Sequence, residues 1–174
     1  MATYKIDAAH SDILFKVKHL MITTVTGNFK SFDATLTAEA KDFSDAQISF
    51  TADVNSIDTR SEQRDGHLKS DDFFNAEKFP QLKFTSTSFS KNGDGYVLKG
   101  DLTIRDITKP VELKAEYSGA MVDPWGQHKV GFEAEGKIKR KEFGLSWDAV
   151  TEAGGVVVSD DVKLQLNVQF IKQN

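Results

Sequence analysis

The sequence contains no cysteine, so no disulfide, thiolate nucleophile or thiolate-bound zinc can form. It also lacks an excess of positive charge. There are 22 lysine and arginine residues against 26 aspartate and glutamate residues, for a net charge of -4. A nucleic-acid-binding domain needs a basic patch that neutralises phosphates. The composition therefore argues against nucleic acid as a partner.

Long apolar runs are missing as well. No run approaches the ~20 residues that a membrane-spanning helix needs, and the first ten residues, MATYKIDAAH, lack the basic and apolar regions of a secretion signal. These absences predict a cytoplasmic protein that does not span a membrane. The alternative is a periplasmic protein whose signal has been removed. With 174 residues and no linker or repeat, we expect one domain over residues 1–174.

Recognisable catalytic and metal-binding patterns are also lacking. The chain has four histidines, and no two of them lie at the short spacing of a metal site. His10, Ser11 and Asp12 are the residue types of a catalytic triad, but immediate neighbours cannot adopt its geometry, and no G-x-S-x-G elbow occurs. We therefore predict no catalytic residue, no metal and no cofactor other than a bound ligand.

What the sequence does contain is alternation. About eight segments alternate apolar and polar residues with the period of a β-strand; residues 162–170 show this most cleanly. Hairpin turns are indicated by Asn-Gly-Asp-Gly at residues 92–95 and by Asp-Pro-Trp-Gly at residues 123–126. One polar face on every strand is typical of antiparallel sheets. The pattern predicts an all-β protein, either an up-and-down barrel or a sandwich.

Two features favour the barrel. The segments are long, at roughly ten residues or about 33 Å, and small residues interrupt the apolar rows that would face inward. A solid core would more often carry Leu, Ile or Val at such positions. The alternative is that some of the 13 phenylalanines fill the gaps and the core is solid. The small inward positions are Ala34, Ala52, Gly100, Ala115, Ala134 and Gly136.

One segment, residues 59–75, does not follow the strand pattern. Thr59 with Glu62 three residues later has the spacing of a helix capping box. A second helical start is indicated at Ser70, and the segment ends on Phe73 and Phe74. We expect a short helical cover with an aromatic underside over the mouth of the barrel.

A capped barrel with an apolar, partly open interior is typical of a lipocalin-type ligand site. Polar candidates for the mouth or the ligand head group are His19, Arg64 and His67, with Arg140 just beyond an inward row; alternatively, these side chains cap helices or tie the cover to the barrel. The ligand should be long and apolar. The predicted lipid-binding lining is Phe15, Val17, Phe50, Leu102, Ile104, Phe132, Ala134, Leu166 and Val168.

Several segments together resemble the YceI-like family, and the most distinctive is RDGHLKSDDFF at residues 64–74. The other matching segments are residues 7–11, 15–20, 25–29, 83–87, 100–111 and 140–144. The resemblance spans nearly the whole chain. It implies a lipocalin-like antiparallel barrel that binds polyisoprenoid-type lipids, such as isoprenoid quinones or prenyl chains. It also implies no enzymatic activity, and many members are exported to the periplasm.

The sequence thus predicts a carrier or sequestering protein for a long isoprenoid-type lipid, either a prenyl quinone or a polyprenyl chain. Two alternatives stay open: a structural or stress-response β-protein with a solid core, and an enzyme that acts on a bound lipid. The sequence also leaves open whether the chain forms a homodimer.

Overall fold

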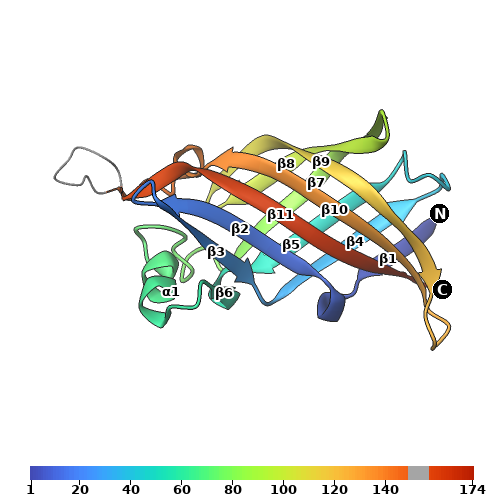
Figure 1. The fold of residues 1–174 in the computed structure, drawn as a ribbon, viewed down its shortest axis with the longest axis horizontal. Helices are drawn as coiled ribbons and strands as arrows, with labels where there is room; N and C mark the ends of the chain where they lie inside the picture. Colours follow the sequence, from blue (N-terminus) through green and yellow to red (C-terminus); the bar gives the residue numbers. More distant parts are fainter. Residues whose placement is uncertain (149–156) are drawn as a thin grey trace.

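The computed structural model describes residues 1–148 and 157–174 (Figure 1). Within these ranges the chain is almost entirely β-structure, with one α-helix and three short 3-10 helices. The elements, in chain order, are β1 (Ala2–Ile6), η1 (Ala8–His10), β2 (Asp12–His19), β3 (Thr23–Phe29), β4 (Phe32–Ala38), β5 (Gln47–Asp53), η2 (Val54–Ser56), β6 (Ile57–Asp58), α1 (Glu62–Lys69), β7 (Gln81–Asn92), β8 (Gly95–Ile104), β9 (Ile107–Val122), β10 (His128–Lys139), η3 (Arg140–Phe143) and β11 (Val158–Lys172).

Eight antiparallel strands close into a ring, which confirms the predicted barrel. The order around the ring is β1-β4-β5-β7-β8-β9-β10-β11, and β11 pairs back onto β1. Both predicted hairpins are present, with β7 meeting β8 at Asn92 and Gly95 and β9 meeting β10 at Val122 and His128. Closure gives every strand in the ring a hydrogen-bonded neighbour on both sides.

Two of the long segments in the barrel wall are interrupted, so that each forms two separate strands. η1 separates β1 from β2, yet β11 pairs with both, through Ile6 with Phe170 and through Asp12 with Asn167. A turn at residues 30–31 likewise separates β3 from β4.

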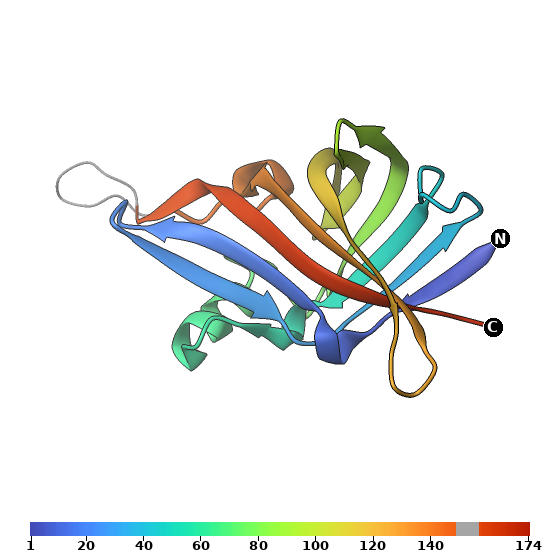
Figure 2. The same cartoon turned by 45° about the vertical axis from the view of Figure 1, so that its right-hand side comes forward.

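The breaks let β2 and β3 leave the ring as a two-stranded arm (Figure 2). The arm is joined to the barrel by the antiparallel pairing of β2 with β11. In both views its tip points away from the chain termini. Among the described residues, the outer edge of β3 pairs only at Asn28 and Phe29, with the short strand β6. The wall is therefore open between β3 and the rest of the barrel, and the segment carrying α1 lies beside this opening.

The cover segment was predicted correctly in its aromatic underside but not in its capping. Helix α1 begins after Ser61, whose hydroxyl accepts the backbone N–H of Arg64 at 3.3 Å, so Ser61 is the N-cap. Thr59 is buried instead, and its hydroxyl and backbone N–H both bind the carboxylate of Asp65. The predicted second start at Ser70 is a turn rather than a helix.

Aromatic rings close the opposite end of the barrel. Phe43, from the loop between β4 and β5, lies edge-on to Tyr4 and to Phe132, with ring centroids 5.6 and 5.4 Å apart. Phe89 stacks on Tyr96 at 4.5 Å, and the Tyr96 hydroxyl donates to the backbone carbonyl of Asp42. Offset and edge-to-face rings pack without gaps. The barrel is therefore plugged at the end that carries the termini.

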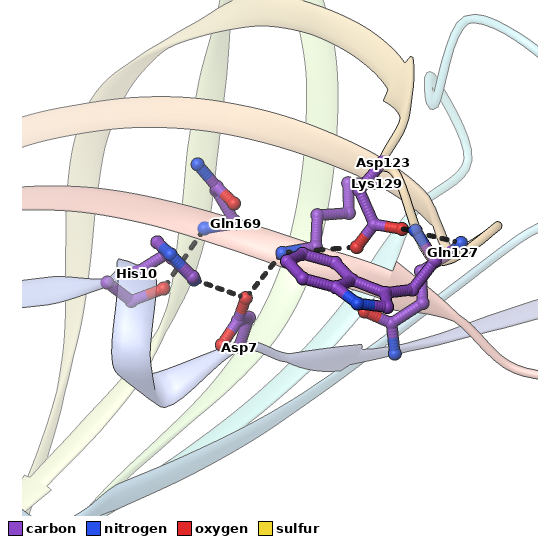
Figure 3. A network of polar contacts seen from close by, with 8 residues as sticks. Asp7, His10, Asp123, Gln127, Lys129 and Gln169 are labelled. Carbon is purple, nitrogen blue, oxygen red and sulfur yellow. Dashed lines mark hydrogen bonds and ion pairs between the residues drawn. The ribbon is translucent and has the colours of Figure 1, made fainter.

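A polar network reinforces this closed end (Figure 3). The Lys129 ammonium lies 2.8 Å from Asp7 and 3.8 Å from Asp123, and His10 contacts Asp7 at 2.8 Å. The hydrogen bond from Lys129 and, to a smaller extent, that from His10 hold the pKa of Asp7 below its usual range. The network ties the break between β1 and β2 to the β9–β10 hairpin. Its contribution is present at neutral pH and declines as acid protonates Asp7.

The small inward residues do not all leave space. A side chain at Gly100 would collide with the Phe84 ring and the Thr85 carbonyl, and one at Gly136 would collide with the Leu113 side chain. The inference that these two glycines open the interior was therefore wrong, because neighbouring large side chains lie over them. At these two positions the solid-core alternative is correct, since large side chains fill the space beside the glycines.

The crowding at Gly100 gives a testable prediction. Gly100→Ala should lower the free energy of unfolding by about 1–3 kcal/mol, because overpacking displaces neighbours that cannot move away. Gly66→Ala is the matched control: nothing lies within 4 Å of the added methyl on α1, and stability should rise by roughly 0.5–1 kcal/mol. Urea unfolding midpoints measure both changes. Equal midpoints for Gly100→Ala and the unchanged protein would contradict the packing at β8.

Candidate functional site

An apolar cavity of about 220 Å³ runs through the barrel interior. Ala34, Ala115 and Ala134 line it, so these three small residues do border open space. All nine residues predicted as lining are also on its wall; whether they contact a lipid stays a prediction. They are Phe15, Val17, Phe50, Leu102, Ile104, Phe132, Ala134, Leu166 and Val168.

The cavity is elongated along the barrel. On β11 alone its lining residues run from Val158 to Phe170. Its volume is below the 300–1,000 Å³ of a typical drug-sized pocket. A long, thin shape suits a flexible chain better than a compact ring system.

The cover closes one side of this cavity. Leu68 from the end of α1, and Phe73 and Phe74 from the following turn, all reach the wall. Phe74 lies edge-on to Phe29 of β3, with centroids 6.1 Å apart. The Arg105 guanidinium holds the turn in place by donating to the carbonyls of Asp71 and Phe73, both at 2.8 Å. The aromatic underside predicted for the cover therefore faces the cavity.

Among the described residues of the wall, Arg140 carries the one polar side chain. It is 3% exposed and follows β10, whose inward row ends at Ile138. Its Nη1 donates to the carbonyls of Leu145 and Trp147, at 2.6 and 2.7 Å. A second pair of bonds runs from Nε to Ser159 O at 2.9 Å and from Nη2 to Val158 O at 3.1 Å.

These bonds use four of the five N–H groups of the guanidinium, and the fifth has no acceptor within the described part of the chain. Burial lowers the pKa of Arg140, while the nearby charges of Asp148 and Asp160 oppose that shift. An arginine stays protonated even so. The site therefore combines an apolar cavity with one buried arginine, whose guanidinium is held by backbone carbonyls behind the wall, close to Phe73 of the cover.

The three residues predicted for the mouth lie outside the cavity wall. Arg64 donates through Nε to the Thr59 hydroxyl at 2.8 Å and also binds the Thr59 carbonyl, so it holds the start of the cover. His67 contacts Asp72 at 2.8 Å, and its ring lies edge-on to Trp147. His19 is half-buried at the end of β2. A contact between any of them and a head group stays a prediction.

The lining predicted from the sequence left out part of the wall. Phe84 and Leu98 lie on it from strands whose alternation was recognised, so the same signal could have found them. Leu145 lies on it from a loop, where no periodic signal exists. The role of Arg140 depends on carbonyls that come from two distant parts of the chain, and sequence spacing does not reveal that convergence.

Within residues 1–148 and 157–174, no three His, Asp or Glu side chains converge as they would around a metal ion. The helices found in those ranges are too short and too polar to cross a bilayer.

Comparisons with known proteins agree with this architecture. The model of the YceI-like domain matches residues 4–170. Protein YceI from Salmonella newport is 42% identical over 174 residues, which cover 99% of this chain and 88% of the Salmonella protein.

Two solved structures share the fold. Burkholderia cenocepacia BcnA superposes with a TM-score of 0.82 at 22% identity, over 94% of this chain and 98% of BcnA. A polyisoprenoid-binding domain from Saccharophagus degradans, implicated in plant cell wall breakdown, superposes with a TM-score of 0.69 at 14% identity over 98% of both chains. The family match extends over nearly all of the sequence, and the chain belongs to the YceI-like family.

Proposed function

We propose that this protein binds one long isoprenoid-type lipid inside the barrel and carries or sequesters it. The observation that carries the proposal is the chemistry of the cavity, whose wall extends along the barrel and is apolar apart from the buried Arg140. The polyisoprenoid-binding domain from Saccharophagus degradans, which has the same fold, supports the assignment. The proposal involves no catalytic step.

The apolar chain supplies most of the binding free energy. Each methylene group moved from water into an apolar cavity contributes about 0.8 kcal/mol. Association and ordering of the ligand oppose binding by several kcal/mol. A chain of three or more prenyl units exceeds that cost, while a single small apolar molecule does not. The ligand is therefore long rather than merely hydrophobic.

Arg140 is the side chain that would select the head group of the bound lipid. One N–H of the guanidinium has no acceptor among residues 1–148 and 157–174, and a ligand carbonyl that reached it would satisfy a buried donor. A quinone carbonyl meets this need without introducing a second charge. Leu145 and Trp147, whose carbonyls Arg140 binds, hold the guanidinium close to Phe73 of the cover, 6.0 Å from the ring centroid. The quinone ring would lie at this end and the prenyl tail along the barrel.

The proposal predicts that the purified protein retains lipid. Protein isolated without detergent and extracted with organic solvent should yield a long-chain prenyl compound in near-stoichiometric amount, as measured by mass spectrometry. After delipidation, a prenyl quinone should quench the fluorescence of Trp147, which packs on the cover beside the cavity. An extract without lipid, together with no quenching by any prenyl quinone, would favour a closed core instead.

A further inference from the structure

Three large apolar side chains are exposed at the tip of the β2–β3 arm. Leu20 is 40% exposed, Met21 is 63% exposed and Ile22 is 78% exposed. Single exposed apolar residues are common on protein surfaces, but a contiguous group on a protruding tip is typical of an interaction site. The tip projects from the end of the barrel opposite the chain termini (Figures 1 and 2).

The turn at this tip has an unfavourable sequence for its backbone. Ile22 N–H donates to the His19 carbonyl at 3.2 Å, and both central residues have positive φ, 53° at Leu20 and 63° at Met21. Such a turn strongly prefers Asn-Gly, because large side chains are strained in the left-handed region. Apolar bulk at these two positions therefore lowers the stability of the hairpin. Strained residues of this kind point to a surface role.

The tip lies directly beside the end of the cavity. Val17 and Val158 both line the cavity. Val158 pairs with His19, the last residue before the turn, and the Leu20 N–H donates to the carbonyl of Val157 at 2.8 Å. The exposed apolar tip therefore begins at the residue after His19, whose strand partner Val158 lies on the cavity wall.

Positive charge flanks the tip on the outer face of the arm. Lys16 and Lys18 alternate with the inward residues Phe15 and Val17. In the described part of the chain neither lysine is paired with a carboxylate, whereas lysines at 139, 141 and 163 are. Apolar residues at a tip with unpaired lysines behind them complement an anionic bilayer, where the lysines meet the head groups.

The second exposed apolar group lies at the other end of the molecule. Met121, Val122 and Trp125 surround the β9–β10 turn and are 75%, 54% and 83% exposed. That turn places Gly126 at its positive-φ position, so its backbone is unstrained. The aromatic plug separates it from the cavity. This group therefore serves as a comparison rather than as a second candidate.

We infer that the tip at residues 20–22 docks the barrel on an anionic lipid bilayer, so that the cavity meets the surface from which an apolar ligand is taken or to which it is returned. This rests on the proposed lipid-binding function. The lipid surface is the partner because the three side chains are too few for a stable protein interface, and because the flanking charge matches anionic head groups.

The decisive variant replaces Leu20 with Asn, Met21 with Gly and Ile22 with Thr. Asn-Gly is the favoured pair for this turn, so the variant should unfold at an equal or higher urea concentration. Its partition onto vesicles of phosphatidylglycerol and phosphatidylcholine, measured by co-sedimentation, should fall at least about tenfold because the inserting apolar surface is gone. Binding of a prenyl quinone in solution should be unchanged.

Two controls complete the experiment. Met121→Asp with Val122→Asp removes similar exposed apolar surface at the closed end and should leave vesicle binding unchanged. Lys16→Gln with Lys18→Gln should weaken binding to anionic vesicles by roughly fivefold per lysine and leave pure phosphatidylcholine unaffected.

Three results would overturn the inference: no vesicle binding by the unchanged protein, vesicle binding that survives the tip variant, or a dimer in sedimentation equilibrium that the tip variant alone makes monomeric. The last result would assign the tip to a second copy of the chain. A failure of the proposed lipid-binding function would be distinguishable from these results. In that case neither the unchanged protein nor any variant would bind a prenyl quinone in solution.

Discussion

Replacing Ala134 with tryptophan is expected to abolish most lipid binding while leaving the barrel folded. Ala134 lies on the cavity wall between Ala115 of β9 and Leu166 of β11, its partners on the two neighbouring strands. The indole would extend into a cavity of about 220 Å³ and take the place of the ligand. The affinity for a prenyl quinone per folded molecule should fall at least about tenfold, equal to 1.4 kcal/mol. The urea midpoint should move little.

Glu135→Trp is the matched control, one residue along and on the outer face of β10. It should change neither binding nor stability. If Ala134→Trp lowers the unfolding free energy by about 1–3 kcal/mol and binding per folded molecule is unchanged, no ligand occupies this part of the barrel. If Glu135→Trp is the disruptive change, the ligand-facing side of β10 has been assigned to the wrong face.

The inward face of the strands could be predicted from the sequence because it depends on one local property. Successive side chains on a strand point to opposite sides, so recognising the alternation assigns every residue to a face. Phe132 and Ala134 on β10, and Leu166 and Val168 on β11, were placed in this way, and they do line the cavity as register partners. The same pattern left a barrel or a sandwich open, and the length of the segments and the small inward residues favoured the barrel.

How open that inward face is could not be predicted, because it depends on which side chains meet across strands. Gly100 and Gly136 suggested open space, yet Phe84 and Leu113 lie over them from the neighbouring strands β7 and β9. Alternation gives the face of a residue but not the direction in which a neighbouring ring turns. The breaks were hidden for a related reason, since they depend on strand pairing: β11 pairs with both β1 and β2 around η1, and across residues 30–31 β3 pairs with β2 whereas β4 pairs with β1.

Polar residues of the cover were the hardest to place. Arg64, His67 and Arg140 were all candidates for a head group on residue type alone. The structure distinguishes them by their partners: Arg64 binds Thr59, His67 binds Asp72, and Arg140 alone lies on the cavity wall. Those partners are five residues away for Arg64 and His67, whereas Arg140 binds carbonyls both five to seven and 18 to 19 residues away.

Removing the Arg140 guanidinium should produce the largest loss of stability of any single change considered for this protein. Arg140→Met keeps an apolar side chain of similar length but leaves the carbonyls of Leu145, Trp147, Val158 and Ser159 without their donor. Each buried acceptor left unsatisfied costs about 1–3 kcal/mol, reduced where water enters. We expect the free energy of unfolding to fall by roughly 3–5 kcal/mol. The fluorescence of Trp147 should shift as its carbonyl loses its anchor.

Lys141→Met, next to Arg140 in sequence, is the control. It breaks an exposed ion pair with Asp148 at 2.7 Å, which should cost no more than about 1 kcal/mol. Arg140→Lys separates charge from geometry, because an ammonium has three N–H donors for four carbonyls and should recover only part of the stability.

Titrations of ligand binding per folded molecule then test the head-group role of Arg140. Affinity for a prenyl quinone should fall in Arg140→Met, while affinity for squalene, which has no head group, should hold. Equal losses for both ligands would show that Arg140 shapes the cavity without contacting the quinone, and an unchanged urea midpoint would contradict its structural role as well.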